Sequence, residues 1–197
     1  VPSYSRSSMA VFPLGLREAA RVLRLGVHYL GPLRQQPVAI HKDRGSQDDI
    51  GIEGEFTASV LHAYGSEMVR RPQKLVSDTA TEGPLIEVLN EEAELLGLAL
   101  SVETQEEKHG IALSLRAPMI SEPLNLTSVG VGVSQVLPVL VRCLLADPGD
   151  VVILEQPELH LHPATEQRLA DFFIRCARSG RQLLIETHSE HMVNRLR

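Results

Sequence analysis

The sequence predicts an α/β fold in which short parallel strands form the core and helices flank them. Two continuous apolar runs of strand length, residues 151–155 (VVILE) and 182–187 (QLLIET), are separated by a helical segment at 163–180. Another strongly apolar helical segment, 136–146, directly precedes the first run. Apolar strands that alternate with helices are typical of a parallel sheet covered on both faces.

The first part of the chain predicts mixed elements. Residues 13–30 have apolar side chains at helical spacing, interrupted by Gly26, and then pass through HYLGPLR into a Gly-Pro turn. Residues 41–54 are polar and rich in glycine, which indicates a loop. A short helix is expected at 55–64, and a proline-bounded linker at 70–84.

A helix and a hairpin are predicted next. Residues 85–98 form an amphipathic pattern whose apolar stripe would contain Leu85, Val88, Leu89, Leu95 and Leu96. The alternating runs ALSVETQ and IALSLRA, separated by EEKHG, predict a β-hairpin. These elements suggest three regions: 1–65, a small α+β lobe at 66–126, and 127–197 with the parallel strands.

Composition narrows the function classes. Hydrophobic residues make up 43% of the 197 residues, enough for a buried core, and aromatic residues only 4%, so this core is aliphatic. The net charge of −6 argues against a general nucleic-acid surface. No apolar run approaches the roughly 20 residues that cross a bilayer. Cys143 and Cys176 lie in apolar stretches, which favours buried free thiols and a cytoplasmic protein.

One carboxylate stands where ligands gather in parallel sheets. The apolar run 151–155 ends in Glu155, and the carboxyl ends of parallel strands are the usual ligand-binding edge. A carboxylate there can hold Mg²⁺ beside nucleotide phosphates, which is the form of a Walker B element. The alternative is a core strand that simply ends in a charged loop.

The residues that follow favour the first reading. They are EQPELHLHP (155–163), and ETHSEH (186–191) ends the next apolar run. This tandem resembles the ABC-type ATPase heads of the RecF, SMC and OLD families, and in particular the bacterial AAA-family ATPases that carry both motifs. The resemblance implies a partial P-loop NTPase fold, with Glu155 as the Mg²⁺ residue, Gln156 and Glu158 near the attacking water, and His188 as the switch histidine.

A glycine-rich segment before these motifs completes the resemblance. Residues 127–135 (TSVGVGVSQ) are expected to form a loop that opens a helix, and they resemble the ABC signature. Glycines let backbone N–H groups approach phosphate oxygens at a helix N-terminus. The resemblance implies that this loop and the D-loop contact nucleotide, through Gly130, Gly132, Ser134, Gln135 and His162. The simpler reading of the glycines alone is a loop-to-helix turn.

Two departures from the family pattern stand out. The sequence contains no Gly-x-x-x-x-Gly-Lys-Ser/Thr loop, so Walker A is missing through truncation, splitting or loss. We expect an internal fragment of a longer ATPase, inactive by itself. In addition, Gln156 stands where many ABC heads have a catalytic Glu, and a neutral amide is a poor base. Glu158 or His188 would then take part of that role.

The resemblance also implies cofactors and partners. The cofactors would be ATP and Mg²⁺, with ATP held between two heads of a head-to-tail homodimer. Closure of the heads would drive an effector, such as a nuclease or a DNA-binding element, in DNA maintenance or phage defence. The link to an effector is analogy at the level of fold.

Two other functions compete with an ATPase. His160, His162, His188 and His191, with glutamates nearby, have spacings that suit zinc, which would indicate a metal-dependent hydrolase. The second alternative is a non-catalytic dimerisation or interaction module, because the chain has no phosphate-binding loop of its own.

Overall fold

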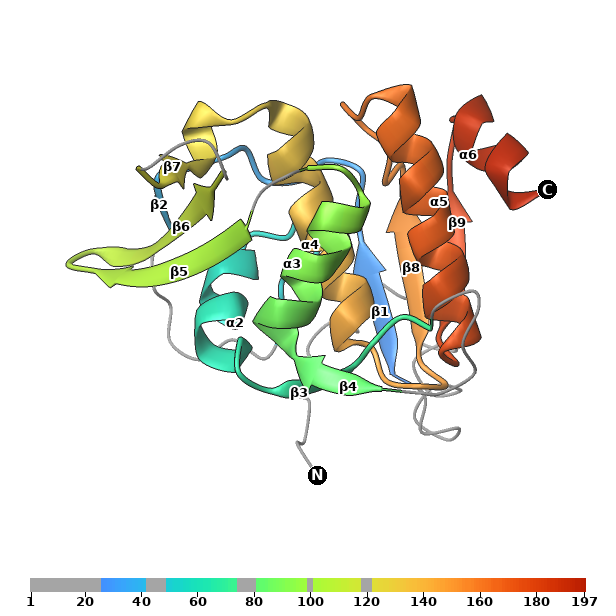
Figure 1. The fold of residues 1–197 in the computed structure, drawn as a ribbon, viewed down its shortest axis with the longest axis horizontal. Coiled ribbons are helices and arrows are strands. Elements are labelled where there is room, and N and C mark those ends of the chain that lie inside the picture. Colours follow the sequence, from blue (N-terminus) through green and yellow to red (C-terminus); the bar gives the residue numbers. More distant parts are fainter. Residues whose placement is uncertain (1–25, 42–48, 74–80, 99–100, 118–121) are drawn as a thin grey trace.

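A three-stranded parallel sheet lies in the right-hand half of the molecule in Figure 1. The computed structural model describes residues 26–41, 49–73, 81–98, 101–117 and 122–197. The strands are β1 (Val27–Leu30), β8 (Val151–Glu155) and β9 (Gln182–Glu186), in the order β1-β8-β9. The predicted strands 151–155 and 182–187 are therefore present and parallel.

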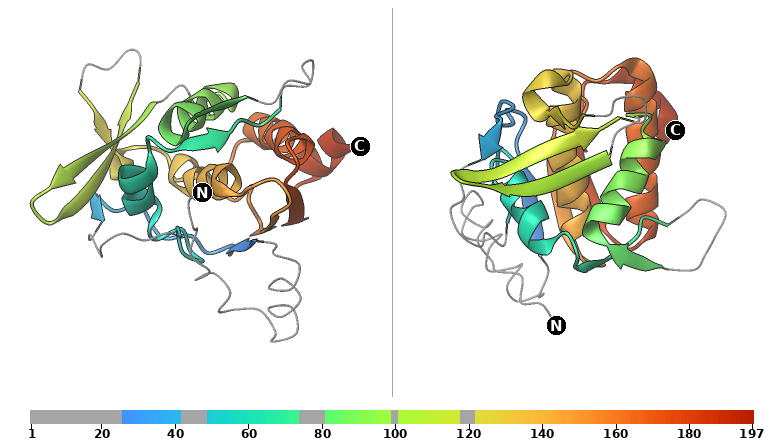
Figure 2. Two further views of the ribbon diagram at one scale, coloured as in Figure 1. Left: turned by 90° about the horizontal axis from the view of Figure 1, so that it is seen from below. Right: turned by 60° about the vertical axis from the view of Figure 1, so that its left-hand side comes forward.

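Helices cover one face of this sheet in the described part of the chain. The helices are α4 (Val131–Leu145), α5 (Pro163–Arg178) and, beside β9, α6 (Glu190–Leu196) (Figure 2). Val152 and Leu154 point into this layer and are fully buried, whereas Leu184 is 62% exposed. The prediction of strands buried on both faces is therefore wrong for the described residues, where burial alternates along β8 and β9.

A second, antiparallel sheet lies beside the helices. The hairpin β5 (Ser101–Glu107) and β6 (Gly110–Arg116) confirms the prediction from alternating residues, and β2 (Ile40–His41) and β7 (Leu124–Asn125) pair with β6. A 3₁₀ turn, η2 (Leu126–Ser128), follows β7. Leu113 and Leu115 of β6 face the common hydrophobic core.

Two helices pack between this lobe and α4. They are α2 (Thr57–Tyr64) and α3 (Leu85–Leu95), near the predicted spans. Part of the predicted linker 70–84 is instead β4 (Glu82–Pro84), which pairs with β3 (Met68–Arg70). The predicted stripe of α3 is correct except at Leu95, which is 55% exposed because Leu96 at the end of the helix takes the buried position.

Two further predictions need correction. Residues 27–30 are a strand rather than the end of a helix, because β1 pairs with β8, and residues 13–25 lie outside the described residues. The loop expected at 127–135 is largely helix, since α4 begins at Val131 with Gly130 as its N-cap. Gly132, Ser134 and Gln135 therefore lie in the first turns of α4.

Two further expectations concern the state of the cysteines and the presence of membrane-spanning helices. Cys143 and Cys176 are both free and buried, as predicted. Among the helices of the described segments, none has the length and apolar character that a membrane span requires.

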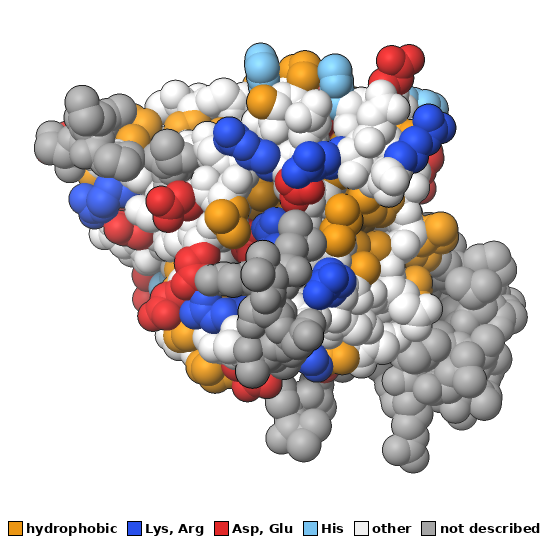
Figure 3. Space-filling model, turned by 45° about the vertical axis from the view of Figure 1, so that its right-hand side comes forward, with side chains coloured by type: hydrophobic (Ala, Val, Ile, Leu, Met, Phe, Trp, Pro, Cys, Tyr) orange, Lys and Arg blue, Asp and Glu red, His pale blue; other side chains and the backbone are white. Residues whose placement is uncertain are grey.

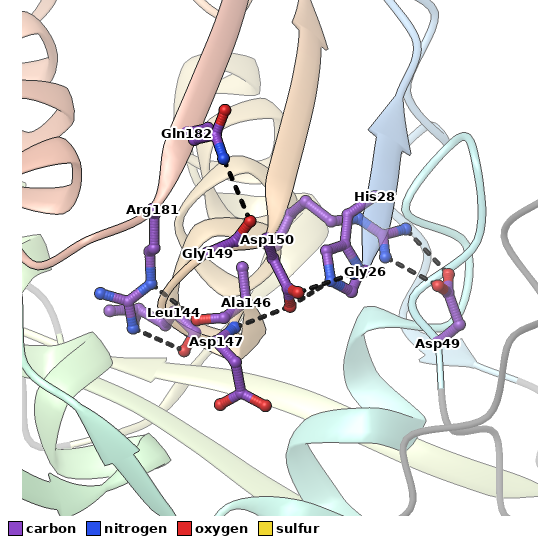
Figure 4. Close-up of polar contacts among 11 residues, drawn as sticks. Gly26, His28, Asp49, Leu144, Ala146, Asp147, Gly149, Asp150, Arg181 and Gln182 are labelled. Atoms are coloured by element: carbon purple, nitrogen blue, oxygen red, sulfur yellow. Dashed lines mark hydrogen bonds and ion pairs between the residues drawn. The ribbon is translucent and has the colours of Figure 1, made fainter. Parts of the chain in front are cut away.

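The amino end of β8 is tied by a network around Asp150 (Figure 4). The carboxylate of Asp150 accepts hydrogen bonds from the Gly26 amide (2.8 Å), the Asp147 amide (2.9 Å) and His28 Nε2 (3.0 Å). Burial alone would raise the pKa of Asp150, but these three donors outweigh it and hold that pKa below its ordinary value. The network joins β1 to the turn before β8.

Two buried arginines complete this end of the molecule. Arg181 is 2% exposed and donates to the carbonyls of Ala146 (2.7 Å), Arg70 (2.7 Å) and Leu144 (3.2 Å). Arg142 of α4 is also 2% exposed, and its two terminal nitrogens each lie 2.8 Å from a carboxylate oxygen of Asp49. This geometry is bidentate, the stronger form of an arginine–carboxylate pair.

Candidate functional site

Two carboxylates stand side by side at the carboxyl ends of the central strands. Glu155 ends β8 and Glu186 ends β9, and the two residues are direct partners in the parallel register. The hydroxyl of Tyr29, on β1, donates to Glu155 Oε1 at 2.9 Å. Burial and the bond to Glu155 raise the pKa of Tyr29, so this hydroxyl keeps its proton and remains a donor.

Gln156 begins the turn that follows β8, and its backbone is in the left-handed region with φ of 44°. Its amide donates to the Glu186 carbonyl at 2.8 Å, which continues the pairing of β8 and β9 by one bond. Left-handed backbone is unfavourable for a residue with a side chain, and it occurs often at functional sites. The regular strand therefore ends at Glu155, and the chain changes direction at Gln156.

Glu158 connects this turn to the end of β9. Its Oε1 accepts a hydrogen bond from the backbone amide of His188 at 2.8 Å. Its Oε2 is buried and has no hydrogen-bond partner among the described residues. The carboxylate thus fixes the main chain at His188, which is a different task from that of a base near the attacking water.

The His188 side chain lies at the surface of the same edge. It is 76% exposed, and its Nε2 is 3.4 Å from Glu186 Oε1. A hollow of about 360 Å³ adjoins it, lined by Thr187, Ser189, Glu190 and residues of α6. Histidine side chains gather along the top of the molecule in Figure 3, the end at which the strands finish. His188 is therefore fixed at its backbone while its ring is open to a ligand.

The predicted signature and D-loop residues contact each other. Gly130 is exposed, with nothing within 4 Å of the place a Cβ would occupy. A Cβ on Gly132 would lie 2.6 Å from the carbonyl oxygen of His160. The backbone of His160 is itself left-handed, with a φ of 65°. Only glycine allows this close approach between α4 and the loop after β8.

Three other predicted nucleotide-contacting residues have partners within the chain. The Ser134 hydroxyl is in a buried residue and donates to the Val131 carbonyl at 2.7 Å. Gln135 is also buried and donates to the Gln35 carbonyl at 3.4 Å. His162 is the N-cap of α5, and its Nδ1 accepts from the Ala164 amide at 3.3 Å.

The histidine cluster of the zinc alternative is not assembled. His160 and His162 lie on the loop after β8, whereas His188 and His191 lie around the start of α6. Within the described ranges, no three His, Cys, Asp or Glu side chains are arranged so that they could hold a metal ion.

The sequence did not predict Tyr29 or Arg34 at this site, and it predicted Glu186 only as one of the glutamates near the histidines of the zinc alternative. Arg34 lies in the loop after β1 and donates to the Glu155 and Gln156 carbonyls. Tyr29 and Arg34 belong to HYLGPLR, for which the sequence predicts the end of a helix and a turn. A strand in this apolar stretch would be the first signal, but its pairing with β8 appears only in the fold.

One known protein family matches most of this chain. The family described as "AAA domain, putative AbiEii toxin, Type IV TA system" matches residues 39–194 of the chain. The chain belongs to this AAA domain family. The match includes the loop after β8, the end of β9 and the start of α4, so it supports an ATPase module that uses nucleotide. Curated proteins give no match.

Solved structures with a similar arrangement include heads of SMC proteins. One is the SMC head bound to the C-winged helix domain of ScpA, 14% identical over 56% of this chain and 37% of that chain, with a TM-score of 0.45. Another is the SMC head domain from Thermotoga maritima, 17% identical over 56% of this chain and 39% of that chain, with a TM-score of 0.42. The AAA domain thus spans less than half the length of either.

Proposed function

We propose that this chain is the half of an ATP-hydrolysing head that carries the Mg²⁺-binding and water-activating residues. The observation that carries the proposal is the convergence of Glu155, Gln156, Glu158 and His188 at the ends of two paired strands. These residues lie inside the region matched by the AAA domain family. In this proposal the phosphate-binding loop comes from a segment outside these 197 residues.

The donor set at this edge suits a divalent cation. Glu155 and Glu186 are register partners on neighbouring strands, where main chains lie roughly 4.8 Å apart, so two carboxyl groups stand at the same edge of the sheet. Mg²⁺ is usually held by one or two carboxylates together with substrate phosphates. Glu155 would hold Mg²⁺, with Tyr29 fixing the orientation of its carboxylate.

The groups proposed to lie near the attacking water differ in whether they can accept its proton. Bound ATP supplies the γ-phosphoryl group that water attacks. The Gln156 amide can accept a hydrogen bond from water but cannot take its proton. The neutral His188 ring can do both, and its Nε2 lies 3.4 Å from Glu186 Oε1. His188 is therefore the better base in this site, while Glu158 holds its backbone.

The surface around the start of α4 suits a second copy of the head. Gly130 and His160 are exposed, and Val131 is 49% exposed, although it is a large apolar residue at a helix N-terminus. This patch of open backbone could reach a phosphate bound to a partner, and buried Ser134 would only shape it. We propose a head-to-tail homodimer around ATP, with Gly130 and Gly132 at the interface.

The test is ATP turnover by the full-length protein with His188→Ala. We expect turnover to fall by about 100-fold, the range typical for loss of a positioned acid–base group. The thermal midpoint should stay unchanged, because the side chain is 76% exposed. A His191→Ala variant, changed three residues further along the chain, is the matched control and should keep its activity. Equal turnover by His188→Ala and wild type would refute the assignment.

A second experiment tests the homodimer. Sedimentation of the full-length protein with a non-hydrolysable ATP analogue should give a dimer, and without nucleotide a monomer. Val131→Asp should prevent the dimer because it places a charge in the interface. A dimer that forms equally well in Val131→Asp would contradict this surface.

Closure of two heads would drive an attached nuclease or DNA-binding element in DNA maintenance or phage defence, by analogy of fold. DNA that raises the rate of ATP turnover would support a DNA-linked effector, and an unchanged rate over a range of DNA lengths would count against it.

A further inference from the structure

The side chain of Arg34 lies beneath the turn that carries the proposed catalytic groups. Arg34 is 6% exposed, and its Nη2 donates to the carbonyls of both Glu155 (2.9 Å) and Gln156 (3.0 Å). The loop that carries it is itself fixed, since the Gly31 amide donates to the Ile52 carbonyl and the Gln35 amide to the Glu53 carbonyl. A rigid segment therefore delivers a cation to two successive carbonyls.

Two nitrogens of the buried Arg34 guanidinium lack hydrogen-bond partners among the described residues. These are Nε and Nη1, and both are buried. Burial lowers the pKa of Arg34 to about 10, and the nearby Glu158 carboxylate opposes that change. The side chain is still charged near neutral pH. Burying a charge without full pairing is unfavourable, so such a group is usually retained for a task other than stability.

The two carbonyls that Arg34 contacts lie on either side of the left-handed residue. Gln156 has a φ of 44°, and both of its backbone polar groups are bonded. Its carbonyl accepts from Arg34, and its amide donates to the Glu186 carbonyl. Because carbonyl and side-chain directions are coupled through the backbone, fixing both carbonyls fixes how the Glu155 and Gln156 side chains leave the strand. Rotation of this turn would displace both groups together.

Glu158 extends the same arrangement to the end of β9. Its attraction to Arg34 acts across the turn, and its Oε1 holds the His188 amide. One cation thus binds the backbone of Glu155–Gln156 and attracts the carboxylate that fixes His188. Its depth argues against a direct contact with phosphate, because a side chain that is 6% exposed presents little surface to a ligand.

We propose that Arg34 is a positioning residue that orients Glu155 and Gln156, and through Glu158 the His188 loop, for ATP hydrolysis. The proposal rests on the function proposed above. It predicts a defect in turnover rather than in ATP affinity, because the arginine acts on groups around the water and the metal rather than on the nucleotide.

The first experiment measures kcat and KM for ATP in the full-length protein with Arg34→Gln and Arg34→Lys. Arg34→Gln should lower kcat by about tenfold or more with KM almost unchanged, as expected when groups are misplaced by a fraction of an ångström. Arg34→Lys should recover much of kcat, since one ammonium can donate to both carbonyls. A raised KM with unchanged kcat would instead indicate a phosphate contact and overturn the proposal.

Arg181→Gln is the matched control. Arg181 is equally buried and also donates to backbone carbonyls, but at the amino end of β8. It should lower the thermal midpoint and leave kcat of the folded protein unchanged. If Arg34→Gln behaves in the same way, Arg34 has only a structural role.

A second experiment needs no nucleotide. Hydrogen exchange should show the Gln156 and His188 amides, which are bonded to Glu186 and Glu158, exchanging about tenfold faster in Arg34→Gln, with α4 unchanged. Unchanged exchange at Gln156 would overturn the positioning role. A wild-type protein that lacks ATP turnover would refute the proposed function, while exchange would still report on Arg34.

Discussion

The two ends of strand β8 use their polar groups in different ways. At the amino end, Asp150 accepts three hydrogen bonds and Arg181 donates to three carbonyls. At the carboxyl end, Gln156 has a left-handed backbone, and Arg34 and Glu158 each keep buried polar atoms that no described group satisfies. Arg142, also near the amino end, keeps a buried Nε without a partner among the described residues, so unpaired atoms occur at both ends. The clearer difference is the left-handed backbone of Gln156, because strain in a residue with a side chain is common at functional sites. This difference is why we place the proposed chemistry at the carboxyl end.

Removal of an ion pair near the amino end should have the largest effect on stability. Asp49→Ala leaves the buried Arg142 charge without its bidentate partner, and we expect unfolding to become easier by about 3 kcal/mol. Urea unfolding followed by circular dichroism measures this change. The control is Glu103→Ala, which breaks an exposed pair with Arg116 and should change stability by less than about 1 kcal/mol. Similar losses in the two variants would show that the network does not stabilise the fold.

Acid should weaken the hydrogen bonds to Asp150, and the resulting fall in the free energy of unfolding should be the next largest effect. The folded pKa of Asp150 lies below the ordinary value near 4, so its contribution is fully present above about pH 4 and is lost as pH falls through the folded pKa. Unfolding free energy measured from pH 7 down to pH 2 should decline in that window. Asp150→Asn should flatten part of the decline, and an identical pH profile in the variant would contradict the network.

A smaller effect of opposite sign is expected at the carboxyl end. Gln156→Gly relieves a left-handed backbone and should stabilise the protein by up to about 1 kcal/mol, while ATP turnover falls because the turn loosens. Thermal unfolding and turnover assays measure the two changes.

Gly149→Ala is the matched control at the amino end of β8. Its φ is 97° and a Cβ there meets nothing within 4 Å, so any change reports on the backbone alone. It should lower stability by about 1 kcal/mol and leave turnover intact. A stabilised Gln156→Gly variant with full turnover would show that the strain has no functional role.

These two ends also differ in how well the sequence predicts them. The strand that ends in Glu155, the helix after it and the hairpin follow from local patterns of apolar residues, and the structure contains all three. The Tyr29 and Arg34 contacts were missed because they depend on pairing β1 with a strand more than 100 residues later, which no local pattern encodes. The start of α4 was misjudged because glycines at 130 and 132 indicate a loop, yet close packing on His160 requires Gly132 inside the helix.

Most predicted site residues lie near one edge of the sheet, but their roles differ in detail. Glu155 and Gln156 are partly exposed and the His188 side chain is 76% exposed, whereas Glu158 binds the chain itself. His162 and Ser134 serve their own helices. Motif positions therefore predicted residues that lie close together in the fold, while the proposed division between catalytic and supporting residues needed hydrogen bonds that only the folded chain provides.

The most direct test of the central claim is ATP hydrolysis by the full-length protein with Glu155→Gln. The substitution removes the carboxylate charge but retains an oxygen that can accept the bond from Tyr29. We predict loss of Mg²⁺-dependent hydrolysis by about 100-fold or more, with an unfolding midpoint equal to that of wild type. Undiminished hydrolysis in Glu155→Gln would show that the carboxyl end of β8 is not the ATPase site.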